Sequence, residues 1–304
     1  MTGGQRTQVI TGTDGIARPR PPTSVGAAPP AALEPIEGPS AFGGGTRRLL
    51  SLLWLTAMQD FRLMYRNSVL GYVWTLMRPL AYFAVLYVVF THILRFGDTV
   101  PNYAVILLMN IMLFQFFADA TGTAMGSVVR GEPIVRKMHF PRIVIPLAIV
   151  LTAAMTSAMN LVVVVGFMLV SGVDPQLSWL LLPAIVTALV AFSAATAVLL
   201  SMAYVWMRDL EHVWTVVIRV LFYGTPVLYP LELVPESFRW AVALNPLTGI
   251  LYQARIWLVE PDAEPLVDVV GLAPVAGSIA IAIAVCVSGI WLFVRQAPRV
   301  AEAL

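Results

Sequence analysis

IVIPLAIVLTAAMTSAMNLVVVVGFMLV is the sequence of residues 143–170, and no side chain in it is charged. About 20 predominantly apolar residues suffice for a helix to cross the hydrocarbon core of a bilayer, which is about 30 Å thick. Further apolar runs lie on both sides of this one, so the sequence predicts six membrane-spanning helices and an all-α integral membrane protein. The six runs are residues 80–94, 103–129, 143–170, 177–207, 213–228 and 271–294.

The fifth run, 213–228, is the weakest of the six. It is short, it contains Arg219, and it continues into Pro226 and Pro230. Proline removes a backbone donor and ends or kinks a helix, so the chain is expected to turn here.

The composition excludes several classes of protein. Hydrophobic residues make up 59% of the chain and charged residues only 12%, with a mean hydropathy of +0.81. Soluble domains carry roughly 25% charged residues, so water is not the main solvent of this chain. The net charge of +2 argues against a nucleic-acid partner, and the single cysteine, Cys286, excludes a disulfide framework or a cysteine metal site.

The distribution of charge predicts the orientation in the membrane. Most of the 19 Lys and Arg residues fall on one side if the N-terminus is inside, whereas residues 232–268 are rich in Asp and Glu. Basic residues near short loops stay in the cytoplasm. Both termini are therefore expected to be cytoplasmic.

The N-terminal region divides into two parts. Residues 1–45 are rich in Pro and Gly and predict a disordered cytoplasmic tail. A membrane domain follows at 46–298, and a short cytoplasmic tail at 299–304. In residues 48–66, Arg48, Arg62 and Arg66 share one helical face, which favours an amphipathic helix lying in the membrane interface over an ordinary first span.

Energy coupling has to come from elsewhere. A P-loop needs a Lys that follows Gly and precedes Ser or Thr, but the only lysine, Lys137, lies between Arg136 and Met138. Any ATP-driven work therefore needs a separate ATPase subunit that binds ATP and Mg, and no cofactor is expected in this chain. Paired intramembrane carboxylates are missing, so Asp119 and Arg219 do not favour an ion relay.

The loop VVRGEPIVRKMHFPRIVIP, residues 128–146, lies between the second and third predicted spans. Gly131, Pro133 and Pro141 interrupt helix formation and leave room for a short cytoplasmic segment with basic and apolar faces. Such a segment suits docking on a partner, and a plain positive-inside anchor is the alternative.

Five short stretches resemble the permease subunits of ABC type-2 polysaccharide exporters. They are LGYVWTLMRPL at 70–80, KMHFPRIVIPL at 137–147, WMRDL at 206–210, PVLYP at 226–230 and NPL at 245–247. The resemblance covers about residues 46–298 and rests on the order of the stretches relative to the spans.

The resemblance implies a pore formed by two copies of the chain, with two ABC ATPase subunits bound below. The residues it places near the ATPase are Arg48, Arg62, Arg130, Glu132, Arg136, Lys137 and Arg142. It also implies two re-entrant helices after the fifth span, in residues 225–259, with an external amphipathic loop as the alternative. The outer gate would then include Pro226, Pro230, Trp240, Pro246 and Tyr252.

Aromatic residues are the candidates for contact with a glycan, because sugar C–H faces pack on rings and tyrosine hydroxyls bond to sugar hydroxyls. The candidate pathway residues are Tyr82, Phe83, Tyr87, Phe90, Phe114, Phe117, Tyr223 and Tyr229. The alternative for each ring is packing between helices or at the membrane interface.

The resemblance implies export of a lipid-linked cell-envelope polysaccharide. Arginine outnumbers lysine eighteen to one, which suggests a GC-rich genome and a bacterial cell membrane as the location. In such bacteria a wall galactan is the expected glycan, with teichoic-acid or O-antigen glycans as further options. One alternative is an ABC type-2 exporter of a drug or lipid. Another is a polyprenyl-lipid glycosyltransferase, which needs acidic metal ligands near the membrane surface. The inner loops offer only the scattered Asp60, Glu132, Asp209 and Glu211.

Overall fold

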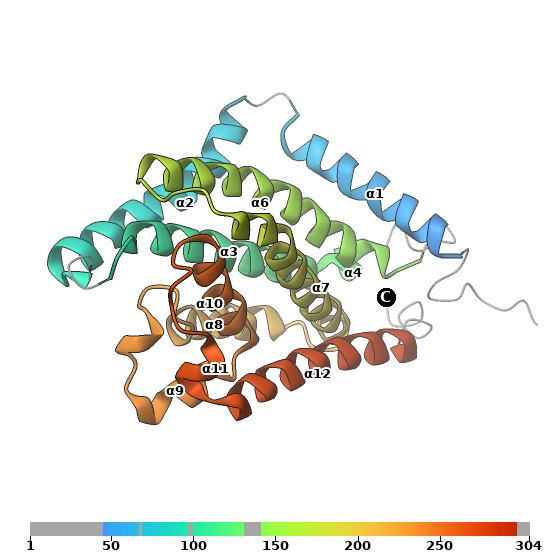
Figure 1. Ribbon diagram of the computed structural model, residues 1–304. Helices are drawn as coiled ribbons and strands as arrows, with labels where there is room; N and C mark the ends of the chain where they lie inside the picture. The colour runs from blue at the N-terminus through green and yellow to red at the C-terminus, as the bar shows by residue number, and fades with distance from the viewer. Residues whose placement is uncertain (1–44, 67–68, 97–99, 131–140, 297–304) are drawn as a thin grey trace, which may run out of the picture. The chain divides into compact units, whose positions relative to one another are not determined.

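The computed structural model describes residues 45–66, 69–96, 100–130 and 141–296. Within these ranges every regular element is a helix, with no strand (Figure 1). The all-α prediction is confirmed for this part of the chain. Residues 1–44 and 297–304, which hold nearly all of the two predicted tails, lie outside the described residues.

Five helices in the described ranges are long and apolar enough to cross a membrane. They are Val73–Ile93, formed by α2 (Val69–Tyr87) and the π-helix η1 (Val88–Ile93); α3 (Tyr103–Met125); α6 (Val144–Val170); Leu177–Trp206, formed by the 3-10 helix η3 (Leu177–Leu181) and α7 (Leu182–Trp206); and α12 (Leu272–Gln296). They coincide with five of the six predicted runs. The first starts before residue 80 because the helix continues through Pro79, which a membrane helix tolerates.

The remaining predicted run folds differently. It contributes α8 (Leu210–Gly224), a helix of 15 residues, which ends just before Thr225 and Pro226. Fifteen residues fall short of the roughly 17–25 that a membrane-spanning helix needs. A sixth crossing therefore stays a prediction.

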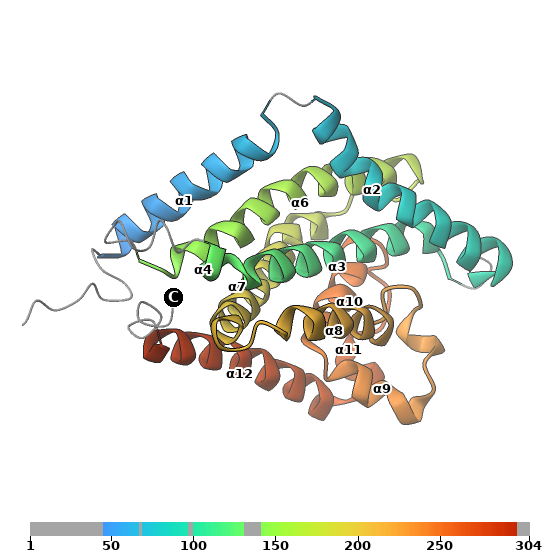
Figure 2. The ribbon, with the colours of Figure 1, turned by 180° about the vertical axis from the view of Figure 1, so that it is seen from behind.

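Helix α3 is the centre of the helix packing. It lies between α2 and α8 and packs against α6 and α7 (Figures 1 and 2). Its sequence is apolar on nearly all sides, and a helix of that kind is stable when neighbours cover it. The buried side chains include Leu107, Leu108, Met109, Met112 and Leu113, and they form the main hydrophobic cluster with α6, α7, α8 and α10.

The two ends of the helix packing carry opposite charge. At one end a second apolar cluster joins α4 (Ser127–Arg130) to the start of α6 and the ends of α7 and α12. This α4 end carries Arg48, Arg130, Arg142, Arg208 and Arg295. The opposite end holds η4 (Leu231–Leu233), α9 (Glu236–Ala243), α10 (Pro246–Leu258) and α11 (Leu266–Val270), and we call it the α9–α11 end. Its acidic residues are Glu232, Glu236, Glu260, Asp262, Glu264 and Asp268.

Helix α1 (Gly45–Met64) is not among the five candidate spans. It packs on the first half of α6, where Ala57 is fully buried and its carbonyl oxygen accepts a hydrogen bond from Thr152 Oγ1 at 3.2 Å. Leu50, Trp54, Leu55, Leu63 and Met64 are exposed in the single chain. The helix therefore presents apolar surface for lipid or protein, and its place in the membrane interface stays a prediction.

Helices α7 and α12 pack closely at Gly289. A Cβ atom at this position would lie 2.9 Å from the carbonyl oxygen of Ala195. Small residues of this kind allow helix backbones to pack closely inside a membrane.

We expect Gly289→Ala to push α12 away from α7 and to destabilise the protein. The matched control is Gly166→Ala on α6, where a Cβ would meet no atom within 4 Å. Both variants gain the same helix propensity from alanine, so their difference isolates the steric cost, about 1–3 kcal/mol. Thermal unfolding of the two purified variants in detergent measures it, and equal midpoints would contradict the close contact.

Candidate functional site

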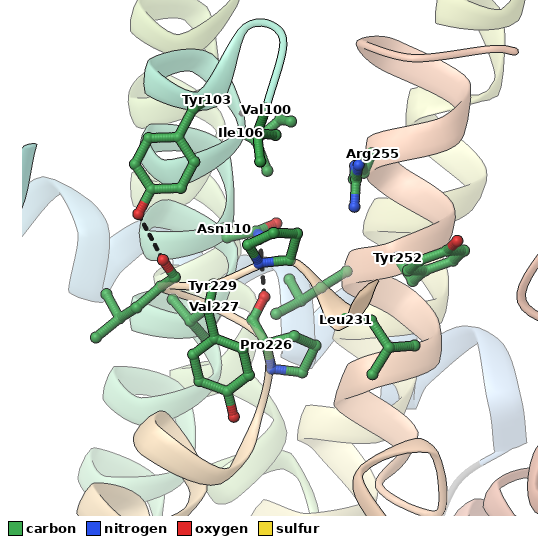
Figure 3. A pocket seen from close by; sticks show the side chains of 13 residues that line it. Val100, Tyr103, Ile106, Asn110, Pro226, Val227, Tyr229, Leu231, Tyr252 and Arg255 are labelled. Atoms are coloured by element: carbon green, nitrogen blue, oxygen red, sulfur yellow. Dashed lines mark hydrogen bonds between the residues drawn. The ribbon is translucent and has the colours of Figure 1, made fainter. Parts of the chain in front are cut away.

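The most unusual segment of the described chain is the stretch that follows α8. Residues 225–228 are buried but not helical. Val227 N–H donates to the carbonyl oxygen of Thr225 within the segment, and the other backbone groups need partners from outside it. Helix α3 supplies two of them: Tyr103 donates a hydrogen bond to the carbonyl oxygen of Leu228, and Asn110 Nδ2 donates one to that of Pro226 at 3.2 Å (Figure 3). A cavity of about 20 Å³ lies between the segment, α3 and α10, which is room for one water molecule.

Asn245 ties the start of α10 to the same segment. Its side-chain oxygen accepts a hydrogen bond from the backbone N–H of Leu247 at 3.0 Å, and its Nδ2 donates to Thr225 Oγ1 at 2.7 Å. Asn is a favoured residue at this capping position, and Pro246 fits the first turn because it needs no donor there. The NPL stretch thus has a local structural reason: it begins a helix and holds Thr225.

Helix α10 enters the main apolar cluster. Leu251, Ala254 and Leu258 are almost fully buried in it, next to side chains of α3 and α7. With 13 residues α10 is too short to span a membrane, yet it packs within the helices that do. The stretch 225–259 is therefore a broken segment, in which residues 225–228 and α10 are packed and most of α9 is exposed.

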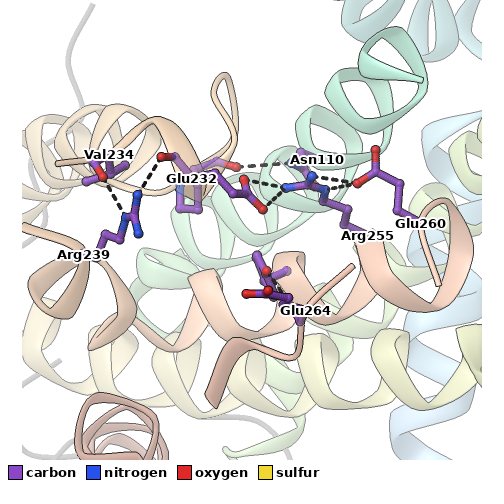
Figure 4. A network of polar contacts seen from close by, with 9 residues as sticks. Asn110, Glu232, Val234, Arg239, Arg255, Glu260 and Glu264 are labelled. Carbon is purple, nitrogen blue, oxygen red and sulfur yellow. Dashed lines mark hydrogen bonds and ion pairs between the residues drawn. The ribbon is translucent and has the colours of Figure 1, made fainter. Parts of the chain in front are cut away.

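Arg255 forms a buried ion-pair network at the end of α10 (Figure 4). Its guanidinium contacts both carboxylate oxygens of Glu232, at 2.9 and 3.0 Å, and Glu260 Oε2 at 2.6 and 2.7 Å. The side chain of Arg255 is only 10% exposed, against 14% for Glu260 and 45% for Glu232. Burial acts to lower the pKa of Arg255, but the two carboxylates outweigh it and raise that pKa above its ordinary value.

Neighbouring groups extend this network. Arg239 donates to the carbonyl oxygens of Val234 and Glu232, both at 2.8 Å. Burial and the Glu232 carboxylate raise the pKa of Tyr252 to about 12, so its hydroxyl stays protonated and donates to the carbonyl oxygen of Glu264 at 2.9 Å. The loop before α9, helix α10 and the turn after it are thereby joined.

A larger cavity of about 620 Å³ opens beside the network at the α9–α11 end. Its charged lining consists of Glu232, Arg239, Arg255, Glu260, Asp262, Glu264 and Asp268, together with apolar residues and Tyr252. The cavity is therefore polar and mainly acidic.

The predicted outer-gate residues are brought together in part. Pro226, Pro230 and Tyr252 are buried around the small cavity, and Pro246 starts α10. Trp240 lies apart from them, exposed on α9. The gate role itself stays a prediction.

Sequence reasoning missed Tyr103, Asn110 and the Arg255 network. Arg255 and Glu260 are only five positions apart, which was the available signal. The partnership with Glu232 joins positions far apart in the sequence, so only the fold brings them together.

The predicted pathway aromatics differ in how far they are buried. Phe114 and Phe117 are buried in the core, Phe114 against Phe222 and Phe117 against Phe192, so they are covered in this arrangement. Phe83 stacks on Tyr87, and both are half-buried.

Tyr82 and Tyr223 are the two exposed rings of the predicted set. Each packs against Phe222, with ring centroids 5.9 and 5.3 Å apart respectively. Tyr229 is half-buried and its hydroxyl donates to the carbonyl oxygen of Tyr223, while Phe90 is half-buried against Phe96.

The predicted ATPase-docking residues are only partly described. Arg48 and Arg62 are exposed on α1, Arg130 is exposed at the end of α4, and Arg142 is half-buried just before α6. Glu132, Arg136 and Lys137 fall within 131–140, outside the described residues.

Five spanning candidates around a broken, packed segment define a multi-pass helical membrane protein. The chain belongs to the ABC-2 type transporter family, which matches residues 51–258. That match includes residues 225–258 of the broken segment, and with them the whole of α10.

Relatives of known name agree with this family. The O-antigen export system permease protein RfbA of Klebsiella pneumoniae is 32% identical over 208 residues, which cover 68% of this chain and 80% of the relative. The protein of the same name from Myxococcus xanthus is 28% identical over 229 residues, covering 74% of this chain and 87% of the relative. The resemblance to ABC type-2 exporter permeases is confirmed.

We expect the Arg255 network to be a main source of local stability. Arg255→Gln leaves the buried Glu260 carboxylate without its cation and should cost about 3–5 kcal/mol. Glu232→Gln removes a half-exposed partner and should cost no more than about 1 kcal/mol. The matched control is Arg95→Gln, an exposed arginine outside the network, expected to change stability by less than about 0.5 kcal/mol. Thermal unfolding midpoints in detergent rank the stability losses of the three variants. An Arg255 variant as stable as the control would contradict the expected ranking.

Proposed function

We propose that this chain is the membrane-spanning subunit of an ATP-driven exporter that moves a lipid-linked cell-envelope polysaccharide out of the cytoplasm. The family membership and the names of the two relatives support this proposal. The broken segment 225–259 is the structural observation that carries it. Non-helical backbone at membrane depth occurs where protein shields it or where it lines a wet cavity, as in transport pathways.

The proposal includes two re-entrant helices, α9 and α10, and a sixth crossing through α8. In support, α10 packs on the spanning helices α3 and α7, whereas an external loop would lie free of them. Helix α8 and the buried residues 225–228 together form a longer path than α8 alone. Pro226, Pro230, Pro246, Trp240 and Tyr252 are the outer-gate residues of this proposal.

The orientation follows from the charges of the two ends. Basic residues gather at the α4 end and acidic residues at the α9–α11 end, which places the α4 end in the cytoplasm by the positive-inside rule. Both termini would then be cytoplasmic and the protein would lie in the bacterial cell membrane.

The partners of the proposal are a second copy of the chain and two copies of an ABC ATPase, which would bind ATP and Mg. The ATPase would dock at the α4 end, through Arg48, Arg62, Arg130 and Arg142 together with Glu132, Arg136 and Lys137. ATP binding would draw these contacts together, and each permease copy would move largely as a rigid body because α3 fixes its neighbours.

The identity of the exported glycan is the most specific part of the proposal. We favour a wall galactan because only one of the 19 Lys and Arg residues is lysine. Such a composition suggests a GC-rich bacterial genome, and a wall galactan is the glycan expected in such bacteria. Tyr82, Phe83, Tyr87, Phe90, Tyr223 and Tyr229 are the ring contacts we propose, and Phe114 and Phe117 would take part only if the helices around α3 move apart.

The docking role predicts that two charge reversals release the ATPase. In Glu132→Lys with Arg136→Glu, co-purification with the ATPase encoded beside the gene should fall by about tenfold, because charge pairs across an interface set much of its specificity. Arg95→Glu, a reversal at an exposed site outside the docking set, is the control and should retain the ATPase. Unchanged co-purification would contradict the docking role.

The transport role predicts accumulation inside the cell. Depletion of the chain should leave lipid-linked glycan in the cytoplasmic leaflet, and restoration of the chain should clear it only with an ATPase whose P-loop lysine is intact. Mass spectrometry of extracted lipids measures this. A depleted cell with normal surface glycan would point to a drug or lipid exporter, and sugar transfer by the purified chain alone would point to a glycosyltransferase.

A further inference from the structure

The uncovered part of α3 is polar, although the helix is otherwise buried. The residues that α3 leaves exposed or half-exposed along one face include Gln115, Asp119, Gly122 and Thr123, which we call the polar face. Their spacing of four, three and one residues places them on one side of a helix. Each of the four is polar or is glycine, whereas the opposite sides of α3 meet α6 and α7 through apolar side chains.

Asp119 is the residue that most needs an explanation. It lies within a candidate span, and Gln115 Nε2 donates a hydrogen bond to its Oδ1 at 2.8 Å. Asp119 is nevertheless exposed among the described residues, with Gln115 at one carboxylate oxygen. A carboxylate that faces hydrocarbon is costly, and ionisable groups inside spans therefore face the bundle interior or a water-filled cavity.

Helix α2 extends the polar face on one side. Arg78 lies close enough to act electrostatically on Asp119, and Tyr82 is one turn further along α2. Both side chains are exposed. Tyr82 in turn lies near Tyr223 of α8, since the two rings share Phe222 between them.

Helix α8 continues the pattern on the other side. It is fixed on α3 through Trp214, whose Nε1 donates to Thr121 Oγ1 at 3.3 Å, and through the contact of Phe222 with Phe114. Its exposed side chains divide into two arcs at about 100° per residue. The polar arc holds Glu211, His212, Thr215, Arg219 and Tyr223, and the apolar arc holds Val213, Val216 and Val220.

We propose that the polar face of α3, with Arg78 and Tyr82 of α2 and the polar arc of α8, is one wall of a water-filled pathway, in which Asp119 binds hydroxyl groups of the exported glycan. The claim that water fills this pathway rests only on the observations above. The claim that a glycan binds there also rests on the proposed function. The apolar arc of α8 faces lipid or the second copy.

The chemistry of the wall fits a polyhydroxylated ligand. The carboxylate of Asp119 accepts hydrogen bonds from sugar hydroxyls, Gln115 both donates and accepts, and Thr123 offers a hydroxyl. Arg78 offsets part of the charge of Asp119 and adds further hydrogen-bond donors for sugar hydroxyls. The rings of Tyr82 and Tyr223 offer flat surfaces for sugar C–H groups.

Thiol labelling tests whether the polar face is in contact with water. Cys286→Ser removes the only cysteine, and single cysteines are then introduced as Thr123→Cys or Thr215→Cys. The controls are Val162→Cys on α6 and Ile290→Cys on α12, which are also exposed in the single chain but carry apolar side chains. Because only a hydrated thiol ionises and reacts, a membrane-impermeant sulfonated thiol reagent should label the first pair about tenfold faster than the controls in the assembled complex.

Substitution of Asp119 tests the ligand. Asp119→Asn keeps an acceptor and should lower the export rate by about threefold, while Asp119→Leu removes it and should lower the rate by about tenfold at equal amounts of protein in the membrane. A position that merely faces lipid would accept leucine without loss.

The outcomes separate the two proposals. Equal labelling of Thr123→Cys and Val162→Cys would overturn the wet wall, and full export by Asp119→Leu would overturn the role of Asp119. Fast labelling of Thr123→Cys, together with a wild-type protein that exports no glycan, would keep the wet wall and overturn the glycan as its ligand and the proposed function together.

Discussion

Buried backbone groups must find their partners within the protein, and the irregular residues 225–228 are where this chain meets that constraint most sharply. Proline at 226 and 230 prevents a continuous helix there. Tyr103 and Asn110 reach from α3 to carbonyl oxygens of the segment, and Asn245 holds Thr225 from the other side. The position of α10, and with it the Arg255 network, depends on these few bonds, because they fix the path of the chain between α8 and α10.

Helix α3 has two different environments on its two sides. Its apolar sides are dry and closely packed, which makes it the rigid element on which α6, α7 and α8 rest. Its polar face holds Gln115, Asp119 and Thr123, which the single chain leaves open. The same helix therefore supports the packing and carries the proposed polar wall, and its closely packed sides should deform little when it moves.

The charged groups at the two ends have different physical roles. At the α4 end the arginines are mostly exposed, and orientation and partner binding are the roles proposed for them. At the α9–α11 end Arg255 is buried between Glu232 and Glu260, where the attraction is stronger because less water screens it. The same residue type therefore acts through long-range charge at one end and through local geometry at the other.

The sequence by itself determined the helical class, five of the spans and the family, because apolar runs, proline positions and charge asymmetry are local properties of the chain. It also identified 225–259 as a broken stretch, since the prolines there are visible without a structure. The tertiary structure alone decided that Phe114 and Phe117 are covered while Tyr82 and Tyr223 are open, and that α8 has only 15 residues. It also decided that Arg255 meets Glu232. These depend on which helix faces which, and a helical period shows that a face exists without showing what packs against it.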